Sequence, residues 1–160
     1  MTKTEIHQRF IARIASELES ITAVARKTFA TATSDEHRAE HKYDTFKLES
    51  SFLARGQAKR VEELADALES LKLLPMKDLD RTSPIQLSAL VRLKTSEGWA
   101  RILFVCVAAG GETIEVDGEE ITIVTARSPL GQSVLGKKTG DTFAMNIGST
   151  KHTYKVVSVE

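Results

Sequence analysis

The side chains best placed to do chemistry lie in one polar run, residues 34–44. Glu36 and Glu40 stand four residues apart, which on a helix puts two carboxylates on one face. His37 and His41 have the same spacing and could share a metal ion. No third ligand of defined geometry accompanies them, so two solvated histidines are the simpler interpretation. The run as a whole has two interpretations: a solvated helix end with no function of its own, or a functional tip.

Two long helices are predicted, one before this run and one that begins with it. Thr2 and Glu5 have capping-box spacing, so a helix can begin near residue 3. Thr33 and Glu36 repeat that spacing, which predicts a chain reversal and a second helix from about residue 34 to residue 73. The first helix has an apolar stripe at steps of three and four, formed by Ile6, Phe10, Ile14, Leu18, Ile21, Ala25 and Thr28.

The second helix carries a similar narrow stripe. Such a seam suits one partner helix rather than a face buried in a globule. Pro75 forbids continuation of the helix. Residues 1–75 are therefore predicted to form an antiparallel coiled-coil hairpin with the polar run at its tip. The apolar stripe of the second helix comprises Tyr43, Phe46, Ser50, Leu53, Gln57, Val61, Leu64, Leu68 and Leu71.

Residues 76–160 change to a period of two, which is typical of strands. Pro129 would stop one strand and fit the first turn of a short helix ending at Leu135. Gly136 suits the left-handed residue after a helix. We expect an α+β fold, with the hairpin followed by a small antiparallel β domain containing one short helix. The expected strands are 90–94, 100–107, 112–116, 120–126, 142–147 and 151–159.

Composition excludes several classes of protein. The formal net charge is zero, which argues against a dedicated nucleic-acid binder but not against local basic patches. The single cysteine, Cys106, lies in an apolar run, so we expect a buried structural thiol in a reducing compartment. No apolar run reaches the ~20 residues of a membrane helix, and no signal peptide is visible. We expect a cytoplasmic monomer with no intrinsic cofactor.

The run from Ser128 to Asp141 reads Ser-Pro-Leu-Gly-Gln-Ser-Val-Leu-Gly-Lys-Lys-Thr-Gly-Asp. It resembles the C-terminal signature of the Gre (GreA/GreB) family of bacterial transcription elongation factors. The resemblance implies an FKBP-like C-terminal domain. It also implies a coiled coil that enters the secondary channel of RNA polymerase, where tip carboxylates help to hold a second Mg²⁺ shared with the polymerase. That ion supports the polymerase's own cleavage of backtracked RNA, so nucleic acid would be reached through the complex.

The family's tip motif, Asp-Leu-Lys-Glu-Asn-Ala-Glu-Tyr, fits imperfectly. With its tyrosine aligned on Tyr43, its Asp falls on Glu36, its first Glu on Ala39 and its second Glu on Lys42. Asp35, Glu36 and Glu40 are therefore the candidate tip carboxylates, with Glu36 and Glu40 as the candidate Mg²⁺ ligands in the complex, but in a shifted register. The protein could stimulate cleavage or occupy the channel without it.

Docking on polymerase would need a separate surface. Trp99 and Arg101 are candidates because tryptophan and arginine are enriched at interface hot spots, although a packing role suits Trp99 as well. Lys137 and Lys138 are further candidates. Prolyl isomerase activity is not expected, because this half of the chain has few aromatic residues for the pocket of an FKBP isomerase. The alternative function is a non-catalytic coiled-coil interaction module.

Overall fold

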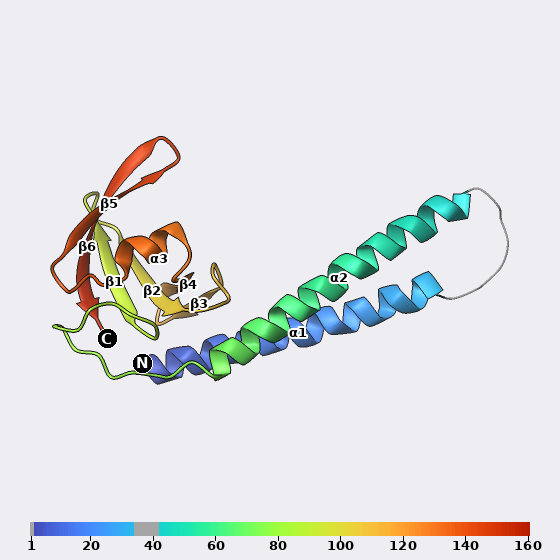
Figure 1. The fold of residues 1–160 in the computed structure, drawn as a ribbon, viewed down its shortest axis with the longest axis horizontal. Coiled ribbons are helices and arrows are strands. Elements are labelled where there is room, and N and C mark those ends of the chain that lie inside the picture. The colour runs from blue at the N-terminus through green and yellow to red at the C-terminus, as the bar shows by residue number, and fades with distance from the viewer. Residues whose placement is uncertain (1, 34–41) are drawn as a thin grey trace. The chain divides into compact units, whose positions relative to one another are not determined.

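The structure, a computed structural model, describes residues 2–33 and 42–160. It contains two compact units (Figure 1). The first combines Met1–Ile11 with Glu69–Glu160, and the second is Ala12–Leu68. This division differs from the predicted one at residue 75. The start of the first long helix, up to Ile11, and the end of the second, from Glu69, belong to the unit that contains the sheet. No helix in the described ranges is long and apolar enough to cross a membrane.

The two long helices are α1 (Lys3–Thr33) and α2 (Lys42–Lys72). The capping box at the start of α1 is confirmed: the Glu5 carboxylate accepts from the Thr2 N–H at 2.7 Å, and the Thr2 hydroxyl accepts from the Glu5 N–H at 3.3 Å. Both N–H groups would otherwise lack a helical partner. The predicted second cap at Thr33 and Glu36 involves residues outside the described ranges.

The hairpin unit, Ala12–Leu68, has a narrow and partly polar seam. Ile14 and Leu64 are buried in it. Farther along, an ion pair crosses between the helices, with the Arg60 guanidinium 2.8 Å from Glu17. Leu53, predicted to lie in the seam, is instead 57% exposed. The prediction was wrong there because residues at steps of three and four repeat about every 3.5 residues, whereas a helical turn has about 3.6. A stripe predicted from such steps gradually shifts around the helix.

The rest of the chain forms one six-stranded sheet in the order β3-β4-β2-β1-β6-β5. Every neighbouring pair is antiparallel except β2 and β4, which are parallel. The parallel pair arises because the chain after β2 makes the edge strand β3 before β4 returns beside β2. Asp117 and Gly118, both with positive φ, form the tight turn expected between β3 and β4. The bounds are β1 Leu90–Thr95, β2 Ala100–Cys106, β3 Thr113–Val116, β4 Glu119–Thr125, β5 Thr142–Ile147 and β6 Thr150–Val159.

The sheet buries both of its faces, in different places. One face, here called the α3 face, packs under the short helix α3 (Pro129–Val134). Its core includes Leu93, Leu103, Val134 and Tyr154, all at most 1% exposed. Alternate residues point to the opposite face. There Phe104 stacks on Phe10 of α1, with ring centroids 5.9 Å apart and planes 12° apart.

The run after β4 owes its shape to a few specific contacts. The Ser128 hydroxyl donates to the Thr125 carbonyl at 2.8 Å and accepts from the Gly131 N–H at 3.0 Å, so it caps α3. Pro129 occupies the first turn of the helix, as predicted. Gly136 has φ of 77°, the left-handed conformation expected after the helix. The predicted strand–turn–helix arrangement is confirmed.

Candidate docking surface

The predicted tip residues Asp35, Glu36, His37, Glu40 and His41 lie outside the described ranges. The proposal that these carboxylates hold Mg²⁺ therefore stays a prediction. Elsewhere in the described part of the chain, no group of three or more histidine, cysteine or acidic side chains could hold a metal ion. The structure does, however, describe all of the residues predicted to dock.

Trp99 lies in the turn before β2 and is 41% exposed, so burial does not support a purely structural role. Its indole N–H donates to the Glu97 carboxylate at 2.8 Å. The Arg101 guanidinium lies over the indole ring, 5.5 Å from the centroid. The His152 ring meets the indole edge-on, with centroids 6.2 Å apart, and its Nδ1 is 3.4 Å from Glu97. These four residues are called the Trp99 cluster.

The contacts of the cluster hold Trp99 in one position while leaving part of its ring open. Arginine against an aromatic face is attractive, and the attraction grows when a partner excludes water. A large aromatic side chain that is already fixed loses little conformational freedom on binding. The cluster therefore has the composition and the preorganisation of a protein-binding anchor.

A cavity of about 620 Å³ adjoins the cluster through Arg101. Leu103 and Thr122 line it on the sheet, and Ser128 and Leu130 line it on the side of α3. The lining mixes apolar groups with polar ones, as does the core and rim of a protein interface. Arg101 contributes to both features, so the Trp99 cluster and the cavity form one continuous surface on the α3 face.

Lys137 and Lys138 belong to a different part of the molecule. The Lys137 ammonium lies 5.7 Å from the centroid of the Phe143 ring. The Lys138 N–H donates to the Asp141 carboxylate at 2.8 Å, which closes the turn into β5. Neither lysine is among the residues that line the cavity. The structure thus brings Trp99 and Arg101 together and leaves the lysine pair apart from them.

Two members of the cluster were not predicted. Glu97 sits in the turn between β1 and β2, and His152 lies in β6, far away in the sequence. Pairing of β1 with β6 sets Thr95 beside Tyr154, which carries His152 to the same end of the sheet. The closeness of Glu97 to Trp99 could have been read from the sequence, because the two are two residues apart. The sequence shows the alternation in β6 but not which strand lies beside it, so no sequence signal would have joined His152 to Trp99.

Cys106 was predicted to be a buried structural thiol, and this is confirmed. It is a free cysteine with 0% exposure at the end of β2. Burial raises the pKa of its thiol to about 12. A thiol with so high a pKa is protonated at neutral pH and does not act as a nucleophile.

Comparison with known proteins shows what the sheet-forming part of the chain resembles. Residues 110–160 match the family model described as "Transcription elongation factor, GreA/GreB, C-term". The match spans β3 to β6 and includes the whole run from Ser128 to Asp141. Residues 110–160 are therefore similar to the C-terminal domain of GreA/GreB factors. The predicted resemblance is confirmed.

Several solved structures are also similar to the chain. The transcription factor Gfh1 is 20% identical, with 97% of this chain and 91% of that chain covered and a TM-score of 0.42. The GreA factor homolog 1 (Gfh1) of Thermus thermophilus is 21% identical over 98% and 93% of the two chains, with a TM-score of 0.38. A prokaryotic elongation factor GreA/GreB from Nitrosomonas europaea is 18% identical over 60% and 78%, also at 0.38. Among curated proteins, none matches the chain.

Proposed function

We propose that this protein is a transcription elongation factor that binds RNA polymerase and is an accessory to the polymerase's own chemistry rather than an enzyme. The match of residues 110–160 to the GreA/GreB C-terminal family model supports the proposal most directly. The Trp99 cluster and its cavity supply the surface for docking. The hairpin then enters the secondary channel, and DNA and RNA are met inside the complex.

At the tip, Glu36 and Glu40 act on the polymerase active centre, with Asp35 beside them. Mg²⁺ takes hard oxygen ligands and is often held by one or two carboxylates from any one protein. A second ion shared with the polymerase would stabilise the charge that develops as backtracked RNA is cleaved. The four-residue spacing of Glu36 and Glu40 favours one helical face.

A second candidate is channel occupancy without cleavage. It is favoured by the sequence of the tip, because Ala39 and Lys42 stand where the family motif has glutamates. A step of one residue turns a side chain by ~100° around a helix. Glu40 would then point away from the position of the lost glutamate, and the protein would compete with cleavage factors instead of acting as one.

A cleavage assay on stalled, backtracked polymerase at fixed Mg²⁺ separates the two candidates. If the tip acts, the protein accelerates RNA cleavage, and Glu36→Ala with Glu40→Ala abolishes the acceleration while polymerase binding is kept. If the protein only occupies the channel, it slows cleavage by an added Gre factor, and the double variant competes as well as the parent. No binding and no effect on cleavage would refute both, and would favour an interaction module.

Docking has its own test. Trp99→Ala combined with Arg101→Ala should weaken polymerase binding by about 2 kcal/mol, or ~30-fold in Kd, the scale of an interface hot spot. Val107→Ala is the matched control, since Val107 is an exposed apolar residue of the same sheet unit, 47% exposed, and does not line the cavity. Equal losses in both variants would show that docking does not use the Trp99 cluster.

A further inference from the structure

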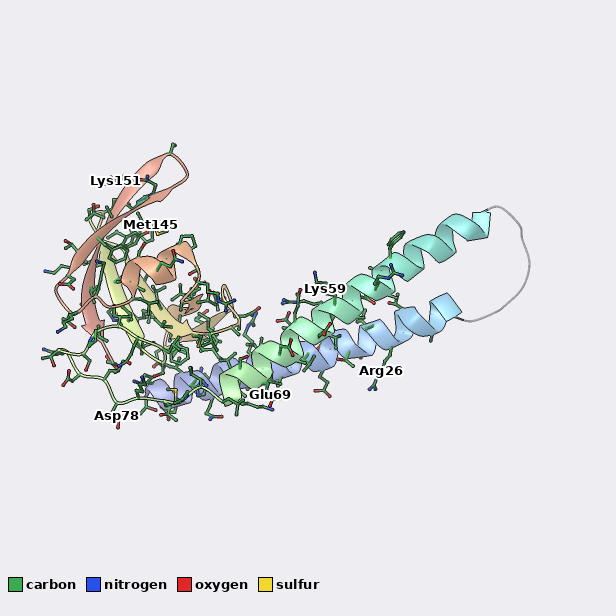
Figure 2. All side chains as sticks on the ribbon, viewed as in Figure 1. Arg26, Lys59, Glu69, Asp78, Met145 and Lys151 are labelled. Atoms are coloured by element: carbon green, nitrogen blue, oxygen red, sulfur yellow. The ribbon has the colours of Figure 1, made fainter. Side chains whose placement is uncertain are left out.

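The side of β1, β6 and β5 opposite the α3 face is open to solvent. Along β6, alternate residues on this side are Lys151, Thr153 and Lys155, and all three are exposed. Lys94 and Ser96 lie beside them at the end of β1 and are also exposed. We call these five residues the basic sheet face. In Figure 2 the labelled Lys151 lies on the long β5–β6 hairpin.

The basic sheet face is hollowed. A groove of about 540 Å³ is lined by Lys94, Ser96, Thr153 and Lys155 together with the turn at Thr139. Buried neighbours in the same strands, such as Tyr154 and Val156, send their side chains to the α3 face. The exposed side chains of the groove are therefore the lysines, the hydroxyl-bearing residues and Val157.

Charge on the basic sheet face is uncompensated. Lys94 is directly opposite Lys155 in the antiparallel pairing of β1 with β6, an arrangement of like charges that destabilises a sheet. Among the ion pairs of the described residues, none involves Lys94, Lys151 or Lys155. Three carboxylates near the face interact with other groups: Glu97 accepts from Trp99, Asp141 accepts from Lys138, and Glu160 interacts with Lys3 and Arg92.

The chain as a whole is neutral, so this excess of positive charge is local rather than a sample of a basic surface. An anionic partner would relieve the repulsion between Lys94 and Lys155. Lysines with interspersed hydroxyl donors are the groups that contact phosphate oxygens in nucleic-acid complexes. An acidic protein segment would need apolar anchors as well, and Val157 is the only apolar side chain that the groove exposes in the described residues.

We propose that the basic sheet face binds the sugar–phosphate backbone of a nucleic acid directly. None of its five residues is aromatic, so bases do not stack on it and binding is independent of sequence. This contact goes beyond the proposed function, in which nucleic acid is reached only through polymerase. It is also independent of that function, because the free protein should bind without polymerase present.

The test is fluorescence anisotropy with a labelled single-stranded oligonucleotide and the full chain at low salt. Three lysines that each neutralise one phosphate give a slope of log K against log salt of about −2. Lys94→Glu with Lys155→Glu should lower the affinity by about tenfold or more, since it removes two of the three phosphate contacts. Circular dichroism verifies that the variant is folded.

The control is Lys59→Glu with Lys72→Glu, which makes the same change in net charge on α2. It should leave binding almost unchanged. An equal loss in the control, or no binding by the parent chain at low salt, would overturn the proposal. So would competition by poly-glutamate as effective as that of unlabelled oligonucleotide at the same charge concentration, because the face would then belong to an acidic protein. None of these readouts depends on the channel or the tip.

Discussion

Gly131 is the position where one methyl group should do the most damage. A Cβ added there would lie 1.9 Å from the Thr125 carbonyl oxygen and 2.8 Å from its carbonyl carbon. Both obstacles are backbone atoms, so no side chain can swing aside. Because ordinary van der Waals contact begins at 3.4 Å, the first turn of α3 would have to move away from β4 by about 1.5 Å.

The magnitude follows from what that movement breaks. The Thr125 carbonyl accepts from the Ser128 N–H at 3.0 Å and from the Ser128 hydroxyl at 2.8 Å, and the Gly131 N–H donates to that same hydroxyl. Three hydrogen bonds at about 1 kcal/mol each are weakened, and residual overpacking adds about 1–3 kcal/mol. The better helix propensity of alanine returns about 1 kcal/mol. We expect Gly131→Ala to lower the free energy of unfolding by roughly 3–5 kcal/mol.

Gly56→Ala is the matched control. Gly56 is inside α2, and a Cβ there meets nothing within 4 Å. The same substitution should therefore stabilise the hairpin by up to about 1 kcal/mol. Trp99, the single tryptophan, reports unfolding of the sheet unit by fluorescence in a denaturant titration, and far-ultraviolet circular dichroism reports the helices. A Gly131→Ala chain as stable as the parent would refute the reasoning, since it would mean that the Ser128 turn relaxes freely.

Two further perturbations test the core. The Tyr154 hydroxyl is buried and has no hydrogen-bond partner in the described residues, so Tyr154→Phe should raise the free energy of unfolding by about 1 kcal/mol; a loss of stability in urea would show that the hydroxyl is satisfied. Burial raises the pKa of Cys106 to about 12, above the ~8.5 of an unfolded thiol. Stability should therefore fall as pH rises from ~8.5 towards 12, because only the unfolded chain loses the proton. Cys106→Ala should flatten that fall, and an unchanged pH slope would contradict the burial argument.

Local chemistry predicted most of the elements. Strand bounds agree to within one or two residues, because alternation and turn residues are properties of a short window. The Ser128 cap and the Thr2–Glu5 box were equally readable, since every partner lies within three residues. The parallel pairing of β2 with β4 was not, because alternation reveals which face a side chain takes and not which strand lies beside it.

The candidate docking surface divides in the same way. Trp99 and Arg101 were predicted from residue type alone, and the structure puts them in contact. Glu97 joins them through the same turn, two residues from Trp99, whereas His152 joins them only through the register of β6 against β1. The basic sheet face was missed for the same reason: Lys94 and Lys155 are 61 positions apart in the sequence and become neighbours only across a strand pair.

The stacking of Phe10 on Phe104 has a consequence for synthesis on the ribosome. The first turns of α1 are synthesised early, yet Phe104, the residue of the sheet that Phe10 contacts, is translated much later. The apolar side chains Ile6 and Phe10 are at most 3% exposed in the folded protein, but they stay exposed until the sheet has been synthesised. Packing α1 against the sheet closes a long loop, which slows this step of folding. In a nascent chain stalled before β2, the apolar face of α1 would be exposed to solvent and prone to aggregation. Holdase chaperones bind segments of this kind.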